Sequence, residues 1–239
     1  MIAVRVVEST ASTNDDAKQA LREGAPTGTV IVARAQTAGR GRQGRAWEAA
    51  PGGCLMGSLV INRILPARRL ALLSLAAGWA VHGFCMQYAR NAQLKWPNDV
   101  LVGGRKLAGI LCESVTRGDE VLGAVIGVGC NLHVRGLPPE LQATATSFEE
   151  HSDHVPDLEN AAADLFARVL HVADDVLARG LGPHLDRLNA VHALAGLEVQ
   201  AQSGARGVVR EIDDEGRLVV QTPTGTERWS SGEVHLVRA

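Results

Sequence analysis

The stretch QTAGRGRQGRAW, residues 36–47, follows a strand-like apolar run, and its centre GRGRQG matches the G-x-G-x-x-G pattern of dinucleotide-binding loops. Such a loop binds a pyrophosphate only when a helix begins directly behind it, because the N–H groups of the helix N-terminus hold the anion. Here six residues separate Gly44 from a Pro-Gly-Gly break, which leaves no room for that helix. We therefore interpret the match as accidental.

A Walker-type phosphate loop does not fit this stretch either. The outer glycines have the required spacing, but Arg45 and Ala46 stand where a lysine and a Ser or Thr are needed. What remains is a glycine-rich backbone that carries Arg40, Arg42 and Arg45. Guanidinium groups bind carboxylates and phosphates in a forked geometry. The loop therefore predicts a site for an anionic ligand, and a solvated basic loop is the alternative.

The composition excludes several classes of protein. The chain has 239 residues, 46% hydrophobic and 21% charged, which suits one domain or a large and a small one. Its net charge of −2 argues against a nucleic-acid binder, which usually carries a basic excess. The N-terminus has no signal-peptide pattern, and the longest apolar run, residues 70–86, predicts a buried helix rather than a membrane span.

The cysteines and histidines predict neither disulfides nor a zinc site. The four cysteines form no C-x-x-C pair and lie among apolar residues, and the eight histidines lack metal-ligand spacing. We expect reduced, buried thiols, which are typical of a cytoplasmic protein.

Hydrophobic periodicity predicts a larger α/β part followed by a small β part. Ser12 or Thr13 is expected to cap the first helix, since Asp15 and Asp16 follow as in a capping box. The elements expected before Ala195 are strands at 3–8, 27–34, 54–61, 92–96 and 120–132, a hairpin at 100–115, and helices at about 13–23, 66–88, 157–179 and 183–194. Later strands at 197–202, 205–213, 216–222 and 226–238 predict a small β-barrel, which gives domains 1–195 and 196–239.

Two further motifs weaken the alternative of a solvated loop. The turn KWPND, residues 95–99, places a lysine, an amide and a carboxylate at the end of a short strand. Lys106 stands at the head of the next apolar strand, where a cation is well placed to meet an anion.

Together these motifs resemble one family. STN (12–14), QTAGRGRQGRAW (36–47), KWPND (95–99), RKLAGILCE (105–113) and GVGCN (127–131) occur in the order and spacing of biotin protein ligases, also called biotin–[acetyl-CoA-carboxylase] ligases. The resemblance covers nearly the whole chain. It implies an α+β fold, a mixed sheet with helices packed on one face as in class II aminoacyl-tRNA synthetases and biotin ligases, followed by an SH3-like C-terminal β-barrel.

The resemblance also implies a two-step reaction. The biotin carboxylate attacks the α-phosphate of ATP to give biotinyl-5′-AMP and pyrophosphate, with Mg²⁺ accompanying the ATP. A lysine of a biotin carboxyl carrier domain, part of an acetyl-CoA or acyl-CoA carboxylase, then attacks the adenylate. A glycine-rich loop that closes after binding would keep the adenylate from water.

The family's site residues carry over to matching positions. The resemblance implies that the catalytic residues are Arg42, Lys106, Asp99 and Lys95. It implies that biotin is bound by Ser12, Thr13, Asn14, Gln36, Arg40, Gly41, Arg42 and Lys106. For ATP and the adenylate it implies contacts with Arg40, Arg42, Arg45, Lys106 and Asn131, with Asn131 expected near the metal as well. Asp99 could orient or deprotonate the incoming lysine, with Lys95 and Asn98 holding that corner.

Some positions depart from the family pattern. His133 replaces the second asparagine of the usual GINVN motif, and the loop 133–152 matches poorly, so its adenine contacts stay unassigned. Arg238 is a weaker candidate for ATP, and Trp47 and Trp96 are expected to support packing. STN begins too early for a preceding winged-helix domain, so we expect a ligase without DNA binding, as a monomer or weak homodimer.

Two other functions stay open. A lipoate or octanoate ligase or transferase would use a related fold and the same carrier lysine, but the intact GRGRQGR loop disfavours it. A non-catalytic sensor of biotin or its adenylate is disfavoured because Lys95, Asp99 and Lys106 occur together.

Overall fold

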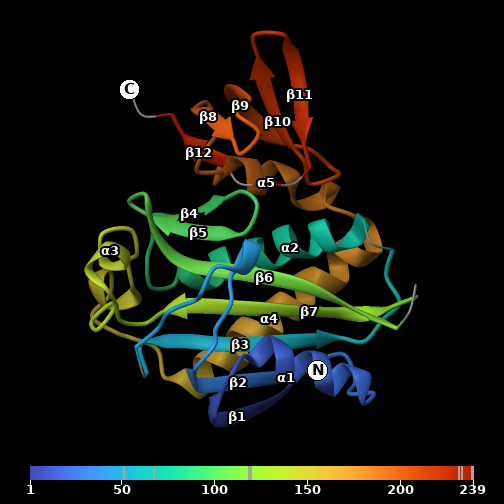
Figure 1. Cartoon of the computed structure of the whole chain (residues 1–239), viewed down its shortest axis with the longest axis vertical. Helices are drawn as coiled ribbons and strands as arrows, with labels where there is room; N and C mark the ends of the chain where they lie inside the picture. Colours follow the sequence, from blue (N-terminus) through green and yellow to red (C-terminus); the bar gives the residue numbers. More distant parts are fainter. Residues whose placement is uncertain (51, 67, 118–119, 231, 233, 238–239) are drawn as a thin grey trace.

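Two sheets organise the chain (Figure 1). The computed structural model describes residues 1–239 except 51, 67, 118–119, 231, 233 and 238–239. The larger sheet has the order β1-β2-β3-β7-β6-β5-β4. Its strands are β1 (Ala3–Thr10), β2 (Thr29–Gln36), β3 (Cys54–Ile61), β4 (Ala92–Lys95), β5 (Asp99–Val102), β6 (Arg105–Arg117) and β7 (Glu120–Asn131). Because β1 and β2 pair in parallel and the other neighbours pair antiparallel, the sheet is mixed, as expected.

Helices lie on both faces of this sheet. The long helices α2 (Arg68–Cys85) and α4 (Leu158–Arg179) pack against each other and against the face that carries Val30, Val32 and Leu55. Helix α1 (Thr13–Arg22) covers the opposite face. The expectation that helices cover one face therefore holds for the long helices only. Alternation along β2 explains the difference, because Ile31 points away from Val30 and Val32 and packs under α1.

The ends of the helices follow local sequence signals in part. Asp157 caps α4, with its side chain accepting hydrogen bonds from the backbone N–H groups of Glu159 and Asn160, and Gly180 ends the helix. Ser12 is the N-cap residue of α1, but its side chain makes no capping hydrogen bond. The capping-box expectation is wrong in this respect, because Asp15 instead forms ion pairs with Lys18 and Arg40.

The remaining elements differ from expectation mainly in length. The hairpin around Gly103-Gly104 is confirmed as β5–β6, with φ of 57° and 77° at the two glycines. The loop 133–152 contains the short helix α3 (Pro139–Gln142), and the helix expected at 183–194 is reduced to α5 (Leu185–Ala190). In the part of the chain that the structure describes, no helix is both long and apolar enough to span a membrane.

The second sheet is antiparallel and has the order β11-β10-β9-β8-β12. Its strands are β8 (Glu198–Ala201), β9 (Arg206–Ile212), β10 (Leu218–Thr222), β11 (Gly225–Trp229) and β12 (Val234–Leu236). The stretch expected as one last strand is therefore two, β11 and β12. The division into domains 1–195 and 196–239 stays a prediction.

Buried contacts join this sheet to the larger body. The indole N–H of Trp96, which is 2% exposed, donates to the carbonyl oxygen of Gly216 at 3.0 Å. Asn189 exchanges two hydrogen bonds with the backbone of Ile212. Trp96 therefore supports packing, as expected.

Candidate active site

The motifs singled out from the sequence meet around two adjoining cavities. The narrow cavity, of about 60 Å³, lies between the start of α1, the end of β2 and the middle of the sheet. The wide cavity, of about 300 Å³, is lined by the glycine loop, the turn 95–99, the head of β6, the loop after β7, and β12. Gly41, Arg42, Trp47, Asn98 and Lys106 line both cavities. They form one continuous site with two compartments.

The topology of β1 and β2 explains why STN and Gln36 meet. The two strands run in parallel with Thr10 opposite Gln36, so the start of α1 and the end of β2 lie at the same edge of the sheet. The side chain of Gln36 accepts hydrogen bonds from the backbone N–H of Thr13 at 2.7 Å and from its hydroxyl at 3.1 Å. Residues 23 positions apart are thus fixed to each other.

A buried hydrogen-bond network forms the wall of the narrow cavity. The hydroxyl of Ser58, which is fully buried, lies 2.8 Å from the hydroxyl of Thr13 and 2.6 Å from the amide oxygen of Asn14. Ser12, Thr13 and Asn14 are buried as well. A small cavity with fixed donors and acceptors suits a compact polar ring, because each buried polar group then requires a defined partner.

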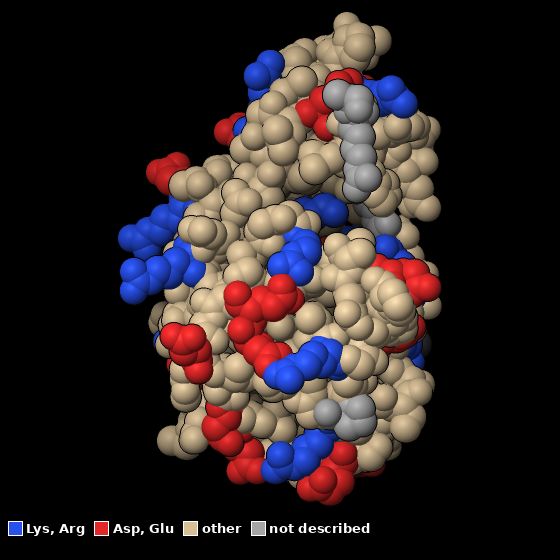
Figure 2. Space-filling view, turned by 90° about the vertical axis from the view of Figure 1, so that its left-hand side faces the viewer, with Lys and Arg blue, Asp and Glu red and all other residues tan. Residues whose placement is uncertain are grey.

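The wide cavity is positively charged. Among its described lining residues, four cations (Arg42, Arg45, Lys95 and Lys106) stand against two carboxylates (Glu48 and Asp99). Figure 2 shows basic side chains in a hollow between the small sheet at the top and the body of the molecule below. Such a cavity attracts anions, since walls of low dielectric strengthen the field of fixed charges.

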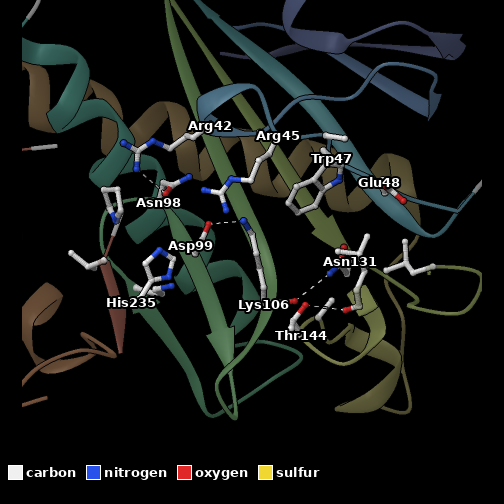
Figure 3. A pocket seen from close by; sticks show the side chains of 18 of the residues that line it. Arg42, Arg45, Trp47, Glu48, Asn98, Asp99, Lys106, Asn131, Thr144 and His235 are labelled. Atoms are coloured by element: carbon white, nitrogen blue, oxygen red, sulfur yellow. Dashed lines mark hydrogen bonds and ion pairs between the residues drawn. The ribbon is translucent and has the colours of Figure 1, made fainter. Parts of the chain in front are cut away.

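At the junction of the two cavities, the head of Arg42 lies beside Asn98, and Lys106 points toward Asp99 (Figure 3). Arg42 donates to the amide oxygen of Asn98 at 3.3 Å, and the ammonium group of Lys106 lies 2.7 Å from Asp99. Burial lowers the pKa of the Arg42 guanidinium, Asp99 opposes this shift, and Arg45 adds to it. Because arginine titrates far above neutrality, Arg42 keeps its charge at this half-buried position.

Trp47 lies flat over the sheet at this junction. A Cβ atom at Gly129 would fall 2.5 Å from its ring, and one at Gly109 would fall 2.9 Å from it. The two glycines are opposite each other in β6 and β7. Lys106 lies 5.3 Å from the centre of the Trp47 ring, within cation–π range. Trp47 therefore forms part of the cavity wall, beyond the packing role expected from the sequence.

The loop after β7 holds the backbone of Lys106. The N–H of Lys106 donates to the carbonyl of Thr144 at 2.8 Å, and its carbonyl accepts from the N–H of Thr146 at 2.9 Å. The amide of Asn131 donates to the carbonyls of Lys106 and Thr146. Asn131 thus fixes the head of β6 to this loop, and its place at the cavity is compatible with the contact to ATP expected from the resemblance.

The structure brings nearly all expected residues to one of the two cavities. Ser12, Thr13, Asn14, Gln36, Arg40 and Gly41 line the narrow cavity, and Arg42, Arg45, Lys95, Asp99, Lys106 and Asn131 line the wide cavity. The guanidinium of Arg40 is held outside the wide cavity by Asp15. Arg238 lies outside the described residues.

Several lining residues were not expected from the sequence. They are Met56, Leu137, Leu141, Thr144, Ala145, Val234 and His235, and Ser58 supports the lining residues Thr13 and Asn14. Ser58 could have been suspected, since it is a polar residue in an otherwise apolar strand. Met56 lies in the same strand β3, and the others depend on how the loop after β7 and strand β12 fold back, for which no local signal exists.

His133 has a contact that explains its place in the loop. Its Nδ1 lies 3.0 Å from the carboxylate of Glu149, which also pairs with Arg135. Among residues 1–50, 52–66, 68–117, 120–230, 232 and 234–237, no group of three or more His, Cys, Asp or Glu side chains could hold a metal ion.

Two family models match this chain. The model of the Biotin/lipoate A/B protein ligase family matches residues 6–131, and that of the Biotin protein ligase C terminal domain matches residues 197–237. The biotin–[acetyl-CoA-carboxylase] ligase of Mycobacterium tuberculosis is 34% identical, with 97% of this chain and 88% of that protein covered. The corresponding ligase of Paracoccus denitrificans is 34% identical, with 94% and 97% covered.

Solved structures agree on the fold. The biotin protein ligase of Aquifex aeolicus, solved with biotin and ATP, superposes with a TM-score of 0.85 over the full length of both chains at 24% identity. The sequence matches span both sheets, and the motifs on which the resemblance rested lie together at one site. The chain belongs to the biotin protein ligases of the biotin/lipoate A/B protein ligase family.

Proposed function

We propose that the chain joins biotin to AMP at the junction of its two cavities and then transfers biotin to a lysine of a biotin carboxyl carrier domain. The observation that carries this proposal is the pair Arg42 and Lys106, which lies where the narrow polar cavity opens into the wide cationic one. The ureido ring of biotin fits the narrow cavity, and the phosphates of ATP fit the wide one.

In the first step a biotin carboxylate oxygen attacks the α-phosphorus of ATP, and the bond to pyrophosphate breaks. Both reactants are anions, so their repulsion and the charge that develops at phosphorus oppose the reaction. Arg42 and Lys106 reduce this barrier with two fixed positive charges. The Thr13, Gln36 and Ser58 network holds the ring of biotin, which places its carboxylate near the phosphate.

In the second step the amine of the carrier lysine attacks the acyl carbon of biotinyl-AMP, and AMP leaves. The amine must be neutral to act as a nucleophile, and it gives up a proton as the amide forms. Asp99 is the carboxylate beside the junction, and its ion pair with Lys106 fixes its direction. Asp99 would orient the amine or accept its proton, and Lys95 and Asn98 would hold the turn that carries Asp99 in place.

Magnesium would enter this site with the nucleotide. Asp99 and the amide oxygen of Asn131 are oxygen donors at the wide cavity, but the described residues include no cluster of metal ligands. This donor set suits an ion held mainly by ATP phosphates and water, which is how Mg²⁺ is commonly bound. When bound, the ion neutralises phosphate charge.

Cytoplasmic localisation and a monomeric or weakly dimeric state also belong to this proposal.

The proposal is tested by a mass spectrum of protein incubated with biotin, ATP and Mg²⁺. We expect biotinyl-AMP bound to the protein and, after addition of a carrier domain, one biotin on one carrier lysine. A lipoyl adenylate formed in preference when lipoate competes would favour a lipoate ligase. Tight biotin binding with no adenylate and no labelled carrier would favour a sensor and contradict the proposal.

A further inference from the structure

Arg40 of the glycine loop forms its ion pairs outside the wide cavity. One nitrogen of its guanidinium lies 2.5 Å from Asp15 of α1 and 3.8 Å from Glu113 of β6. The hydrogen bond from Arg40 lowers the pKa of Asp15, although partial burial opposes the shift. Arg40 therefore ties the loop to two elements of the body of the protein.

The two carboxylates are themselves held in place. Lys18 lies 2.9 Å from Asp15 and 3.0 Å from Glu113, so it fixes both acids from the side of α1. The amide nitrogen of Asn14 donates to Glu113 at 2.7 Å. Only Arg40 in this cluster belongs to the glycine loop. The four other residues form a rigid receptor for its guanidinium.

Asn14 connects this receptor to the narrow cavity. Its amide oxygen lies 2.6 Å from the hydroxyl of Ser58, which also contacts Thr13. Thr13 in turn donates a hydrogen bond to Gln36. Asn14 is buried, and a Cβ atom at Gly127 would overlap its side chain, so it has little freedom to move. A continuous chain of hydrogen bonds and ion pairs thus runs from the wall of the narrow cavity through Glu113, Lys18 and Asp15 to Arg40.

Between Arg40 and Trp47, whose ring packs on Gly109 and Gly129, the glycine loop is held partly by its own backbone. A small backbone ladder closes the loop on itself, with Trp47 N–H donating to Gly39 and Gly41 N–H donating to Arg45. At the tip, Gln43 meets Gln202, in the turn after β8, through an exposed hydrogen bond. The side chains of Arg40 and Arg42 attach the loop at different places, since Arg40 meets α1 and β6 while Arg42 meets Asn98 at the junction of the cavities.

We propose that Asp15 and Glu113 are positioning residues that hold the glycine loop over the site through Arg40, and that a ligand in the narrow cavity reinforces this hold through Asn14. The inference rests on the proposed function, since the ligand is biotin or its adenylate. The two arginines of the loop then have different roles: Arg42 acts at the reacting atoms, and Arg40 keeps the loop closed.

The test measures the escape of preformed biotinyl-AMP from the full chain, diluted into unlabelled ligand, for Asp15→Asn and Glu113→Gln. We expect escape to be about two- to fivefold faster, the range for a partly exposed ion pair. The KM for biotin should rise while kcat at saturating biotin changes less. Biotin should also protect the loop arginines from trypsin in the wild type but less in the variants.

The matched control is Asp16→Asn, which removes a carboxylate from the same first turn of α1 but leaves the contacts of Arg40 intact. It should behave like the wild type, and Asp15→Glu should restore slow escape. In an Arg40→Gln background, Asp15→Asn should add little, because both changes break the same contact.

Wild-type escape in both Asp15→Asn and Glu113→Gln would overturn the proposal, as would equal effects of Asp15→Asn and Asp16→Asn. If Glu113→Gln lowers the unfolding temperature, the proposal is judged by the escape of biotinyl-AMP from Asp15→Asn alone. A wild-type protein that forms no biotinyl-AMP would refute the proposed function instead, so the two failures are distinguishable.

Discussion

Lys106 pairs with Asp99, whose charge also acts on Arg42, so the two cations and one carboxylate at the junction leave a net positive charge. For Arg42→Gly we predict leaky release of biotinyl-AMP and labelling of lysines on unrelated proteins, because the proposed contact of Arg42 with the acyl–phosphate junction would be lost. The measurement is biotin incorporated into a bystander protein beside the carrier domain. Labelling of the carrier alone, at the wild-type rate, would show that Arg42 has another role.

Lys106→Met should affect the chemistry itself. We predict a loss of about 100-fold or more in the rate of adenylate formation, the size expected when a fixed charge at a developing anion is removed. The neighbouring Arg105 pairs with Glu150 and lines neither cavity, so Arg105→Gln is the matched control. Single-turnover formation of biotinyl-AMP measures both variants. Equal losses in the two would indicate a general charge effect rather than a role for Lys106.

Within a single element, strand β7, alanine substitutions at two glycines are expected to have different effects on substrate KM and on stability. In Gly129→Ala the atoms nearest the new methyl group belong to the ring of Trp47, a half-buried side chain carried by a loop, so substrate KM should rise with little change in stability. Gly127→Ala meets the buried side chain of Asn14 instead. Overpacking there should lower the free energy of unfolding by about 1–3 kcal/mol.

Denaturant unfolding and steady-state kinetics on both variants test this contrast. The structural account of β7 would be contradicted if Gly127→Ala kept wild-type stability while Gly129→Ala lost it.

The sequence predicted elements better than their arrangement. Strands such as β3 and β7 are marked by apolar runs with glycine or turn residues at their ends, and the hairpin by Gly103-Gly104, so local signals sufficed. The placement of α1 on the opposite face depended on which alternate residues of β2 faced it. Thr144 and His235 reach the wide cavity through long-range packing, which no local pattern encodes.

At the scale of the whole molecule, His192 links global stability to pH. It is 5% exposed, neither ring nitrogen has a hydrogen-bond partner among the described residues, and burial lowers its pKa to about 4. The folded protein therefore keeps the ring neutral while the unfolded chain binds a proton below about pH 6.5. The stability that this group contributes is complete above that pH and falls as the pH decreases toward 4, by about 2 kcal/mol at pH 5.

His192→Gln should remove this difference between pH 7 and pH 5 in denaturant unfolding. His171→Gln, at an exposed position on α4, should keep it. If both variants retained the wild-type pH dependence, other groups would have to account for it.

In the proposed function, the two cavities together activate biotin with ATP. Biotin-dependent exchange of labelled pyrophosphate into ATP reports on this step alone, because exchange requires reversible formation of the adenylate and no carrier protein. We predict exchange with saturating biotin and Mg²⁺, no exchange without biotin, and its loss in Lys106→Met. Absence of exchange in the wild type under these conditions, or equal exchange with lipoate in place of biotin, would contradict the account.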